Sequence, residues 1–261
     1  MRVSGDLESM SMTDTAAQVA LVTGAGRGLG AEIAVGLARE GWAVAVNDLP
    51  ASTGAAQVVA DIRAIGADVG LFSADVTDEA AVAAAVADIE ARMGTVDVLV
   101  VNATGPQPVI GVEDLTWADL LDQLLFFVKS PTLLVQAVLP GMKRAGRGRI
   151  IMIGSDLFER AEPGLSAYSA AKGAQLGLTR TWARELGSFA ITVNLVAPGW
   201  IPVERHAETP PHMLREYVDG VALRRAGTPA DVAAVVTFLA SDAAGYITGE
   251  RIAVNGGHTL A

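Results

Sequence analysis

Short runs of β-branched and apolar residues alternate with alanine-rich helical patterns along this chain of 261 residues. Several of the runs are apolar at almost every position, which is typical of parallel strands buried on both faces of a sheet. The alternation predicts an α/β fold, a doubly wound parallel sheet with right-handed crossovers. The expected strands are Val19–Thr23, Ala43–Asn47, Val69–Ser73, Val96–Val101, Ile150–Ile153, Thr192–Val196 and Ile252–Val254.

The segments between these strands have the spacing of amphipathic helices. Thr77 and Thr116 each precede such a segment and are the expected N-caps, because a threonine hydroxyl can accept a hydrogen bond from the first helical turn. We find no linker, charge block or internal repeat, so residues 17–261 are expected to form a single domain. The expected helices are Leu29–Glu40, Ala55–Ile65, Asp78–Met93, Trp117–Lys143, Ala167–Gly187 and Ala230–Ser241.

Composition excludes several classes of function. The chain has no cysteine, which excludes disulfides, zinc–thiolate sites, iron–sulfur clusters and thiol catalysis. Its net charge of −10 without basic runs argues against nucleic acid or an anionic membrane as a partner. The most apolar run, Leu120–Leu139, contains Asp122 and Lys129, so no membrane span is predicted. A cytoplasmic location is therefore expected.

The first 16 residues differ from the rest. They are polar, contain Met10 and Met12, and lack the basic and apolar regions of a signal peptide. We expect residues 1–16 to be a flexible leader, or the result of a start codon assigned too early, with the domain beginning near Gln18.

A glycine-rich loop, Thr23–Gly30, joins the first strand to the first helix. Gly24 allows a sharp turn, Gly28 allows the backbone to approach a pyrophosphate, and Gly30 allows the helix to pack closely on the strand. The helix N-terminus then points at the phosphates. This position in the chain predicts dinucleotide binding.

The spacing Thr-Gly-x-x-x-Gly-x-Gly resembles the short-chain dehydrogenase/reductase family, and further motifs resemble that family from about residue 18 to 258. The resemblance implies a Rossmann-type sheet of about seven parallel strands in the order 3-2-1-4-5-6-7, with helices on both faces. Within the family, the chain is similar to 3-oxoacyl-carrier-protein reductase-like and alcohol dehydrogenase members. The motifs are Asp75-Val76, Asn102-Ala103, Ser155 with Tyr168 and Lys172, Asn194–Gly199, Phe238–Asp242 and Ile247–Gly249.

The second expected strand leads into Asp48, where a carboxylate would bind the adenosine ribose hydroxyls and repel a 2′-phosphate. Arg27 argues for NADP, because in the family an arginine there often meets the 2′-phosphate, but Leu49 supplies no second cation. We predict NAD rather than NADP. By resemblance, the cofactor-binding residues are Gly24, Arg27, Gly28, Leu29, Gly30, Asp48, Asp75, Val76, Asn102, Ala103, Tyr168, Lys172, Pro198, Gly199 and Ile201.

Tyr168 and Lys172 are four residues apart on an expected helix and therefore share one face. A tyrosine with an ordinary pKa of ~10 needs ~4 kcal/mol of phenolate stabilisation to act near neutrality. A nearby ammonium and a nicotinamide cation can supply it. The resemblance implies that Tyr168 is the general acid/base, that Lys172 also holds the nicotinamide ribose, and that Ser155 binds the substrate carbonyl.

Three positions depart from the family pattern. The family usually has an asparagine, thought to hold a water in a proton relay, where this chain has Phe127. Thr104 adds bulk beside the nicotinamide ribose, and Val203 replaces a threonine that often contacts the carboxamide. Phe127 either removes the relay or packs in the core while another group substitutes. The departures put the proton path in doubt and leave cofactor binding mostly intact.

Three loops are expected to form the substrate pocket, namely Thr104–Val112, Asp156–Pro163 and the insert after Pro198. The insert, around residues 200–222, is proline-rich and is expected to be a mobile lid of loop or short helices. His206 and His212 lack a third ligand, so no metal is expected. The pocket residues are Gln107, Leu157, Phe158, Trp200, Glu204, Arg205 and His206, a largely apolar set.

The leading interpretation is an oxidoreductase that transfers a hydride between NAD and a secondary alcohol or ketone. A catalytically weak nucleotide-binding scaffold is the alternative, motivated by Phe127. An epimerase or dehydratase is disfavoured, because such relatives need a larger C-terminal domain. By resemblance, the helices Trp117–Lys143 and Ala167–Gly187 pair between subunits, which predicts a homotetramer or homodimer.

Overall fold

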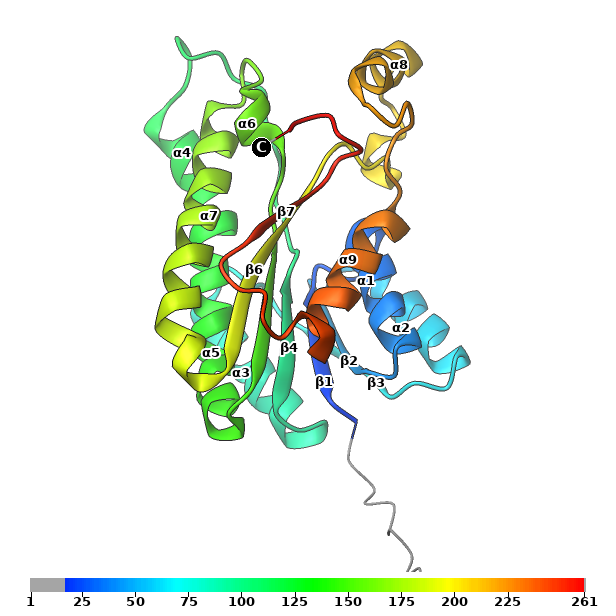
Figure 1. Ribbon diagram of the computed structural model, residues 1–261, viewed down its shortest axis with the longest axis vertical. Helices are drawn as coiled ribbons and strands as arrows, with labels where there is room; N and C mark the ends of the chain where they lie inside the picture. The colour runs from blue at the N-terminus through cyan, green and yellow to red at the C-terminus, as the bar shows by residue number, and fades with distance from the viewer. Residues whose placement is uncertain (1–16, 261) are drawn as a thin grey trace, which may run out of the picture.

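A computed structural model describes residues 17–260 (Figure 1) and shows one seven-stranded sheet. All neighbouring strands are parallel, and their order is β3-β2-β1-β4-β5-β6-β7. The predicted fold class and strand order are therefore confirmed. The strands are β1 (Val19–Thr23), β2 (Ala43–Asp48), β3 (Val69–Ser73), β4 (Val96–Val101), β5 (Gly148–Ile153), β6 (Ile191–Pro198) and β7 (Arg251–Val254).

Helices cover both faces of the sheet, and each layer has its own apolar core. On one face α1, α2 and α9 pack together, and on the other α3, α5 and α7 do so (Figure 1). The central strands β1, β4 and β6 are buried along their whole length. The helices of the two layers are α1 (Gly28–Arg39), α2 (Ala55–Ala64), α3 (Glu79–Arg92), α4 (Trp117–Leu124), α5 (Ser130–Ala145), α7 (Ser166–Leu186) and α9 (Pro229–Ala240).

Of the two predicted caps, one is confirmed and one is wrong. Thr116 caps α4, and its side chain and that of Asp119 form a reciprocal capping box. Thr77 does not cap α3; Asp78 does, by accepting a hydrogen bond from Ala81 N at 2.8 Å. The Thr77 hydroxyl instead donates to Asp75 in the preceding turn. A carboxylate is the stronger acceptor at a helix N-terminus, which explains why the aspartate takes this role.

The expected helix Trp117–Lys143 is continuous but contains a π turn, η1 (Leu125–Lys129), between α4 and α5. Pro131 explains this turn. A proline has no N–H to donate to the carbonyl four residues earlier, here that of Phe127, and its ring clashes with that carbonyl. The backbone widens accordingly, and Ser130 N donates to Leu125 O, five residues back.

The carboxyl ends of the strands meet at one edge of the sheet, where short elements gather. These are α6 (Leu157–Arg160), η3 (Glu204–His206) and α8 (Pro211–Gly220), and the C-terminal segment after β7 returns to the same edge (Figure 1). The predicted lid is thus partly helical. The predicted leader, residues 1–16, lies outside the described residues.

One helical stretch of the described chain, Trp117–Ala145, is long and apolar enough to cross a membrane by length and composition alone. Its segments pack against β4, β5, α3 and α7, so it serves as a core helix of this domain.

Candidate active site

The glycine loop folds tightly against the end of β4. Gly24 has φ +61°, and a Cβ placed there would lie 2.8 Å from the backbone of Ala103. A Cβ on Gly30 would overlap the Gly24 carbonyl and the Asn102 amide. Both glycines are therefore required by the packing of loop, helix and strand, as the sequence predicted.

Thr23 and Asn102 fix the shape of this loop. The Asn102 amide donates to Thr23 O at 2.9 Å and Gly24 O at 3.1 Å. The Thr23 hydroxyl oxygen accepts from Asn102 N and Ala103 N, at 3.0 and 3.2 Å. Asn102 and Ala103 thus lie beside the glycine loop, but the Asn102 side chain is used to hold that loop in shape. Thr23 was not predicted as a site residue, although its place at the first position of the motif signalled it.

The N-terminus of α1 is available to an anion. The helix begins at Gly28 with φ +55°, no side chain of residues 17–260 caps it, and its first turn carries no acidic residue. Its free N–H groups and positive dipole end suit the phosphates of a dinucleotide. The chain's own residues therefore fit the predicted cofactor. Val203 and the carboxylate of Glu204 lie above this end, at 3.4 and 3.3 Å from a Cβ placed on Gly28.

Asp48 lies beside the loop at the end of β2. Its carboxylate accepts from Gly26 N and from Leu49 N, each at 2.8 Å. A Cβ on Gly26 would overlap that carboxylate, so the loop and Asp48 depend on each other. Arg27 is exposed and Leu49 is 53% exposed. The Asp48 carboxylate is thus hydrogen-bonded into the glycine loop, whereas Arg27 is an exposed surface side chain.

The remaining predicted cofactor residues lie along the same edge of the sheet. Asp75 holds the turn after β3, and Val76 is buried beneath it. Pro198 ends β6, and Ile201 is buried in the core. Gly199 faces the lid, because a Cβ there would overlap the Tyr217 hydroxyl. Leu29 packs partly buried against the core below α1.

Ser155, Tyr168 and Lys172 come together as predicted, and all three are buried, with 8, 6 and 4% exposure. Ser155 follows β5, and its hydroxyl oxygen accepts from Leu157 N at 3.1 Å. Burial raises the pKa of Tyr168, and hydrogen bonding with Ser155 offsets part of that rise. The phenol is therefore protonated in the free protein at neutral pH.

Lys172 is surrounded by uncharged groups from Phe127, Ile153 and Gln175. We call these three residues and Lys172 the Lys172 cluster. The Lys172 ammonium donates to Ile153 O at 2.8 Å and to Gln175 Oε1 at 3.1 Å. It lies 3.9 Å from the centroid of the Phe127 ring. Burial, together with the charge of Arg205, holds the pKa of Lys172 well below its ordinary value.

Phe127 belongs both to the core and to the site. Its ring is 2% exposed and meets the Tyr168 ring edge to face, with centroids 5.3 Å apart. The π turn places consecutive side chains on two targets, because Phe126 packs on Gly105 while Phe127 contacts Tyr168 and Lys172. Gln175, 1% exposed, was not predicted as a site residue, because the Tyr-x-x-x-Lys motif on α7 ends at Lys172.

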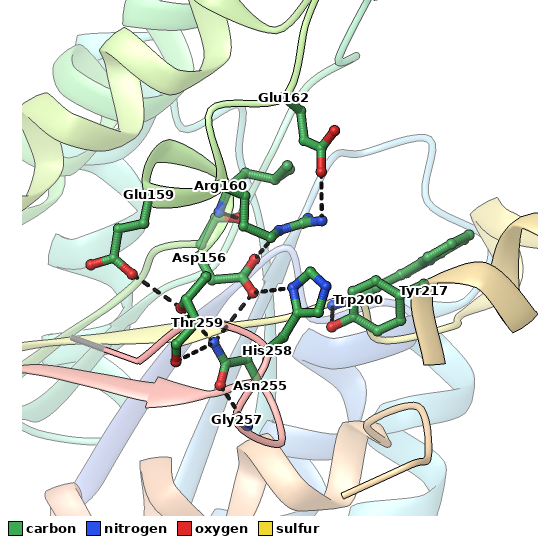
Figure 2. A network of polar contacts seen from close by, with 12 residues as sticks. Asp156, Glu159, Arg160, Glu162, Trp200, Tyr217, Asn255, Gly257, His258 and Thr259 are labelled. Atoms are coloured by element: carbon green, nitrogen blue, oxygen red, sulfur yellow. Dashed lines mark hydrogen bonds and ion pairs between the residues drawn. The ribbon is translucent and has the colours of Figure 1, made fainter. Parts of the chain in front are cut away.

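Asp156, the residue after Ser155, is fully buried and lies at the centre of a polar cluster (Figure 2). Its carboxylate accepts from Arg160 Nε at 3.1 Å and Asn255 Nδ2 at 3.3 Å, and lies 3.7 Å from His258 Nδ1. We call these four residues the Asp156 network. It joins the loop after β5 to the C-terminal segment, and no sequence motif predicted it.

The lid is attached to this network through Tyr217 of α8. The Tyr217 hydroxyl accepts from Trp200 N at 2.8 Å, and its ring packs at a tilt against His258, with centroids 4.6 Å apart (Figure 2). The first two predicted pocket loops also meet, because Ile110 N donates to Gly164 O next to the second loop. The three loops are therefore neighbours, as expected.

Three other predicted pocket residues, Arg205, Gln107 and Phe158, make local contacts. Arg205 is exposed, donates to His206 and lowers the pKa of Lys172 by its charge. The Gln107 amide donates to Thr104, and the Phe158 ring lies 5.6 Å from the Arg251 guanidinium. Among residues 17–260, no group of three or more His, Asp or Glu side chains could hold a metal ion.

Known proteins are similar to this chain over most of its length. A family model described as enoyl-(acyl carrier protein) reductase matches residues 24–259. The chain is 39% identical over 250 residues to the 3-oxoacyl-(acyl-carrier-protein) reductase FabG of Staphylococcus aureus, covering 95% of this chain and 99% of that one. It is 39% identical over 242 residues to FabG of Pseudomonas aeruginosa, covering 92% and 96%.

A solved structure gives the same result. A double Phe→Tyr mutant of a Serratia marcescens short-chain dehydrogenase/reductase superposes with a TM-score of 0.87 at 36% identity, covering 93% of this chain and 98% of that one. Sequence and fold thus agree over nearly the whole chain, and the chain belongs to the short-chain dehydrogenase/reductase family of oxidoreductases.

Proposed function

We propose that this protein is an NAD-dependent short-chain dehydrogenase/reductase that interconverts a secondary alcohol and a ketone. The observation that carries the proposal is the convergence of Ser155, Tyr168 and Lys172, all buried, at the carboxyl edge of the sheet from which α1 also begins. Bound NAD(H) supplies the hydride acceptor or donor of the reaction. The glycine loop, Asp48 and Lys172 are the groups that would hold it.

In this proposal Tyr168 is the general acid/base and Ser155 orients the substrate oxygen. In the oxidation direction the Tyr168 oxygen takes the proton of the alcohol hydroxyl, and in reduction its O–H returns a proton to the carbonyl oxygen. Because burial raises the pKa of Tyr168, the free protein favours the protonated form. In this proposal the role of a protonated Lys172 is to stabilise the phenolate when it forms during the reaction.

The preference for NAD is attributed to Asp48. Its carboxylate is fixed by Gly26 N and Leu49 N, so a 2′-phosphate would meet a negative charge that cannot turn away. We expect tighter NADH than NADPH binding, and Asp48→Ala should narrow the difference about tenfold or more. Titration of both cofactors by fluorescence measures this. Tighter NADPH binding by the wild type would reject the assignment and give Arg27 the deciding role.

The substrate is proposed from the site and the relatives together. Two relatives are named as 3-oxoacyl-carrier-protein reductases, so a 3-oxoacyl thioester is the first ketone to test. The experiment is a screen of the purified protein with NAD(H) and NADP(H) against acyl-thioester ketones, secondary alcohols, sugars and steroids. Tyr168-dependent turnover of any of these supports the proposal.

The scaffold alternative stands because Phe127 occupies the place of the usual asparagine. In this alternative NADH binds and no substrate turns over. Measured NADH binding with no turnover across the screen would favour it. Slow but genuine turnover, more sensitive to pH and to solvent deuterium than in relatives with asparagine, would favour the enzyme.

The assembly, location and lid are part of the same proposal. Exposed apolar side chains on α4 and the loop before it, Trp117, Leu121, Val109 and Val112, support a subunit interface and hence a homotetramer or homodimer. A cytoplasmic location and a lid at residues 200–222 that orders on ligand binding complete it. Light scattering and hydrogen exchange with and without ligands test the assembly and the lid.

A further inference from the structure

Lys172 carries a charge in the interior, and its partners are unusual for such a group. A buried ammonium is expensive unless each of its N–H groups has a partner. Ile153 O and Gln175 Oε1 accept two of them, and the face of the Phe127 ring covers the ammonium at 3.9 Å. The three partners come from β5, α7 and the π turn, so they enclose the charge from different directions.

Each partner favours the protonated form of Lys172. Hydrogen bonds from an ammonium to a carbonyl oxygen strengthen in a water-poor surrounding, and an aromatic face attracts a cation. Phe127 cannot hydrogen-bond a water, so the side of the ammonium that faces its ring has no polar ligand. Ile153 contributes through its backbone, which leaves the Gln175 amide as the one variable oxygen of the cluster.

We propose that Gln175 is a positioning residue for the reaction: together with Phe127 it forms a cradle that holds the Lys172 ammonium against Tyr168. Gln175 supplies the side-chain oxygen, one helical turn along the same face of α7, and Phe127 supplies the aromatic face. This inference rests on the proposed function, since the cradle matters to turnover only if Lys172 serves Tyr168.

Within residues 17–260 the charged neighbours of Lys172 are few, which makes the cradle testable. Arg205 approaches from the lid, and Tyr168 lies on the same helix with its ring centroid 5.6 Å from Nζ. The groups that contact the ammonium from β5 and the π turn, Ile153 O and the Phe127 ring, are uncharged. Changes at Gln175 should therefore act directly on the ammonium.

The first measurement is the pKa of Lys172 in the full-length free protein, read from the ¹³Cε signals of labelled lysine. The lysines are Lys129, Lys143 and Lys172, so assignment by Lys172→Arg is direct. We expect Gln175→Leu to lower the pKa by roughly one to two pH units, because one charge-assisted hydrogen bond is lost. Gln175→Glu should raise it, because a negative charge is added beside the ammonium.

Gln123→Leu is the matched control. Gln123 is also a buried glutamine, 3% exposed, but its amide donates to Pro106 O in another part of the site. It should cost stability without moving the Lys172 signal. Phe127→Leu should also lower the pKa of Lys172, since it keeps an apolar side chain and removes the aromatic face.

The second measurement is the pH profile of kcat and of KM for the cofactor. We expect Gln175→Leu to lower kcat/KM about tenfold and to shift the limb that reports Lys172, while Gln175→Glu restores part of the loss. A folded Gln175→Leu protein with an unchanged Lys172 pKa and unchanged pH profile would overturn the cradle. The NMR readout needs no substrate, so failure of the proposed function would appear separately, as lack of turnover with the Lys172 shift intact.

Discussion

Two buried charges lie in the candidate active site, and they are stabilised in different ways. Lys172 is surrounded by a backbone carbonyl, an amide oxygen and an aromatic ring. Asp156 is paired with the guanidinium of Arg160 and contacts Asn255 and His258. Among the residues that the structure describes, the cation contacts neutral partners, whereas the anion has a charged one.

This difference suggests separate roles for the two residues, one in the reaction and one in holding the fold together. When a buried charge contacts only neutral dipoles, changes in its surroundings can shift its pKa. Burial already lowers the pKa of Lys172. A buried charge in an ion pair is costly to disturb, so it fixes the segments that carry its partners. The Lys172 cluster is accordingly expected to control rate, and the Asp156 network to control stability and the placement of the lid.

The largest effect is expected at the Tyr168 phenol, which contacts the Lys172 cluster through Phe127. Tyr168→Phe removes the acid/base hydroxyl and keeps the ring that packs on Phe127, so turnover should fall by about 10³-fold or more. Cofactor binding, followed by fluorescence titration, should stay near that of the wild type. Tyr246→Phe, at a fully exposed position, is the control and should change neither quantity. Full turnover by Tyr168→Phe would reject the mechanism.

The next effect is on stability, at the Asp156 network. Asp156→Asn leaves Arg160 without its buried partner, and we expect a loss of about 3 kcal/mol in the free energy of unfolding, measured with urea. Asp242→Asn breaks a different Arg–Asp pair, one whose carboxylate is fully exposed, and should leave the urea midpoint unchanged. Equal midpoints for the two variants would show that the network does not anchor the fold.

The smallest effect is expected where the lid approaches the glycine loop at the start of α1. Glu204 places a carboxylate over the N-terminus of α1, where a phosphate would bind. Glu204→Gln should tighten NADH binding about two- to fivefold, because it removes a competing charge at the helix dipole. Glu208→Gln, a second exposed glutamate of the lid, is the control. Unchanged or weaker binding by Glu204→Gln would contradict this placement.

The strands could be predicted because the sequence pattern that specifies each strand is local. Each strand is a short apolar run between turn signals, and the observed strands match the predicted ones within a few residues. The strand order came from resemblance to the family and not from periodicity. The predicted N-cap of α3 was wrong because Thr77 and Asp78 are adjacent capping residues, and only the backbone geometry selects between them.

The site was predicted where a motif specified it and missed where contacts are long-range. Pro131 was visible in the sequence, but helical periodicity assumes 3.6 residues per turn and so conceals a π turn. The role of Gln175 depends on a lysine one turn away that points inward. Asn255 and His258 reach Asp156 from the far end of the chain, which no local pattern records.

The central claim is that Tyr168 is a buried acid/base that becomes reactive only with its cofactor. Its pKa can be measured from the ¹³Cζ signals of labelled tyrosine, with Tyr168→Phe for assignment. We predict a pKa above the ordinary value of about 10 in the free protein, because the phenolate is poorly solvated, and a lower value with saturating NAD⁺. A pKa at or below about 10 in the free protein, or one that NAD⁺ does not lower, would contradict the account.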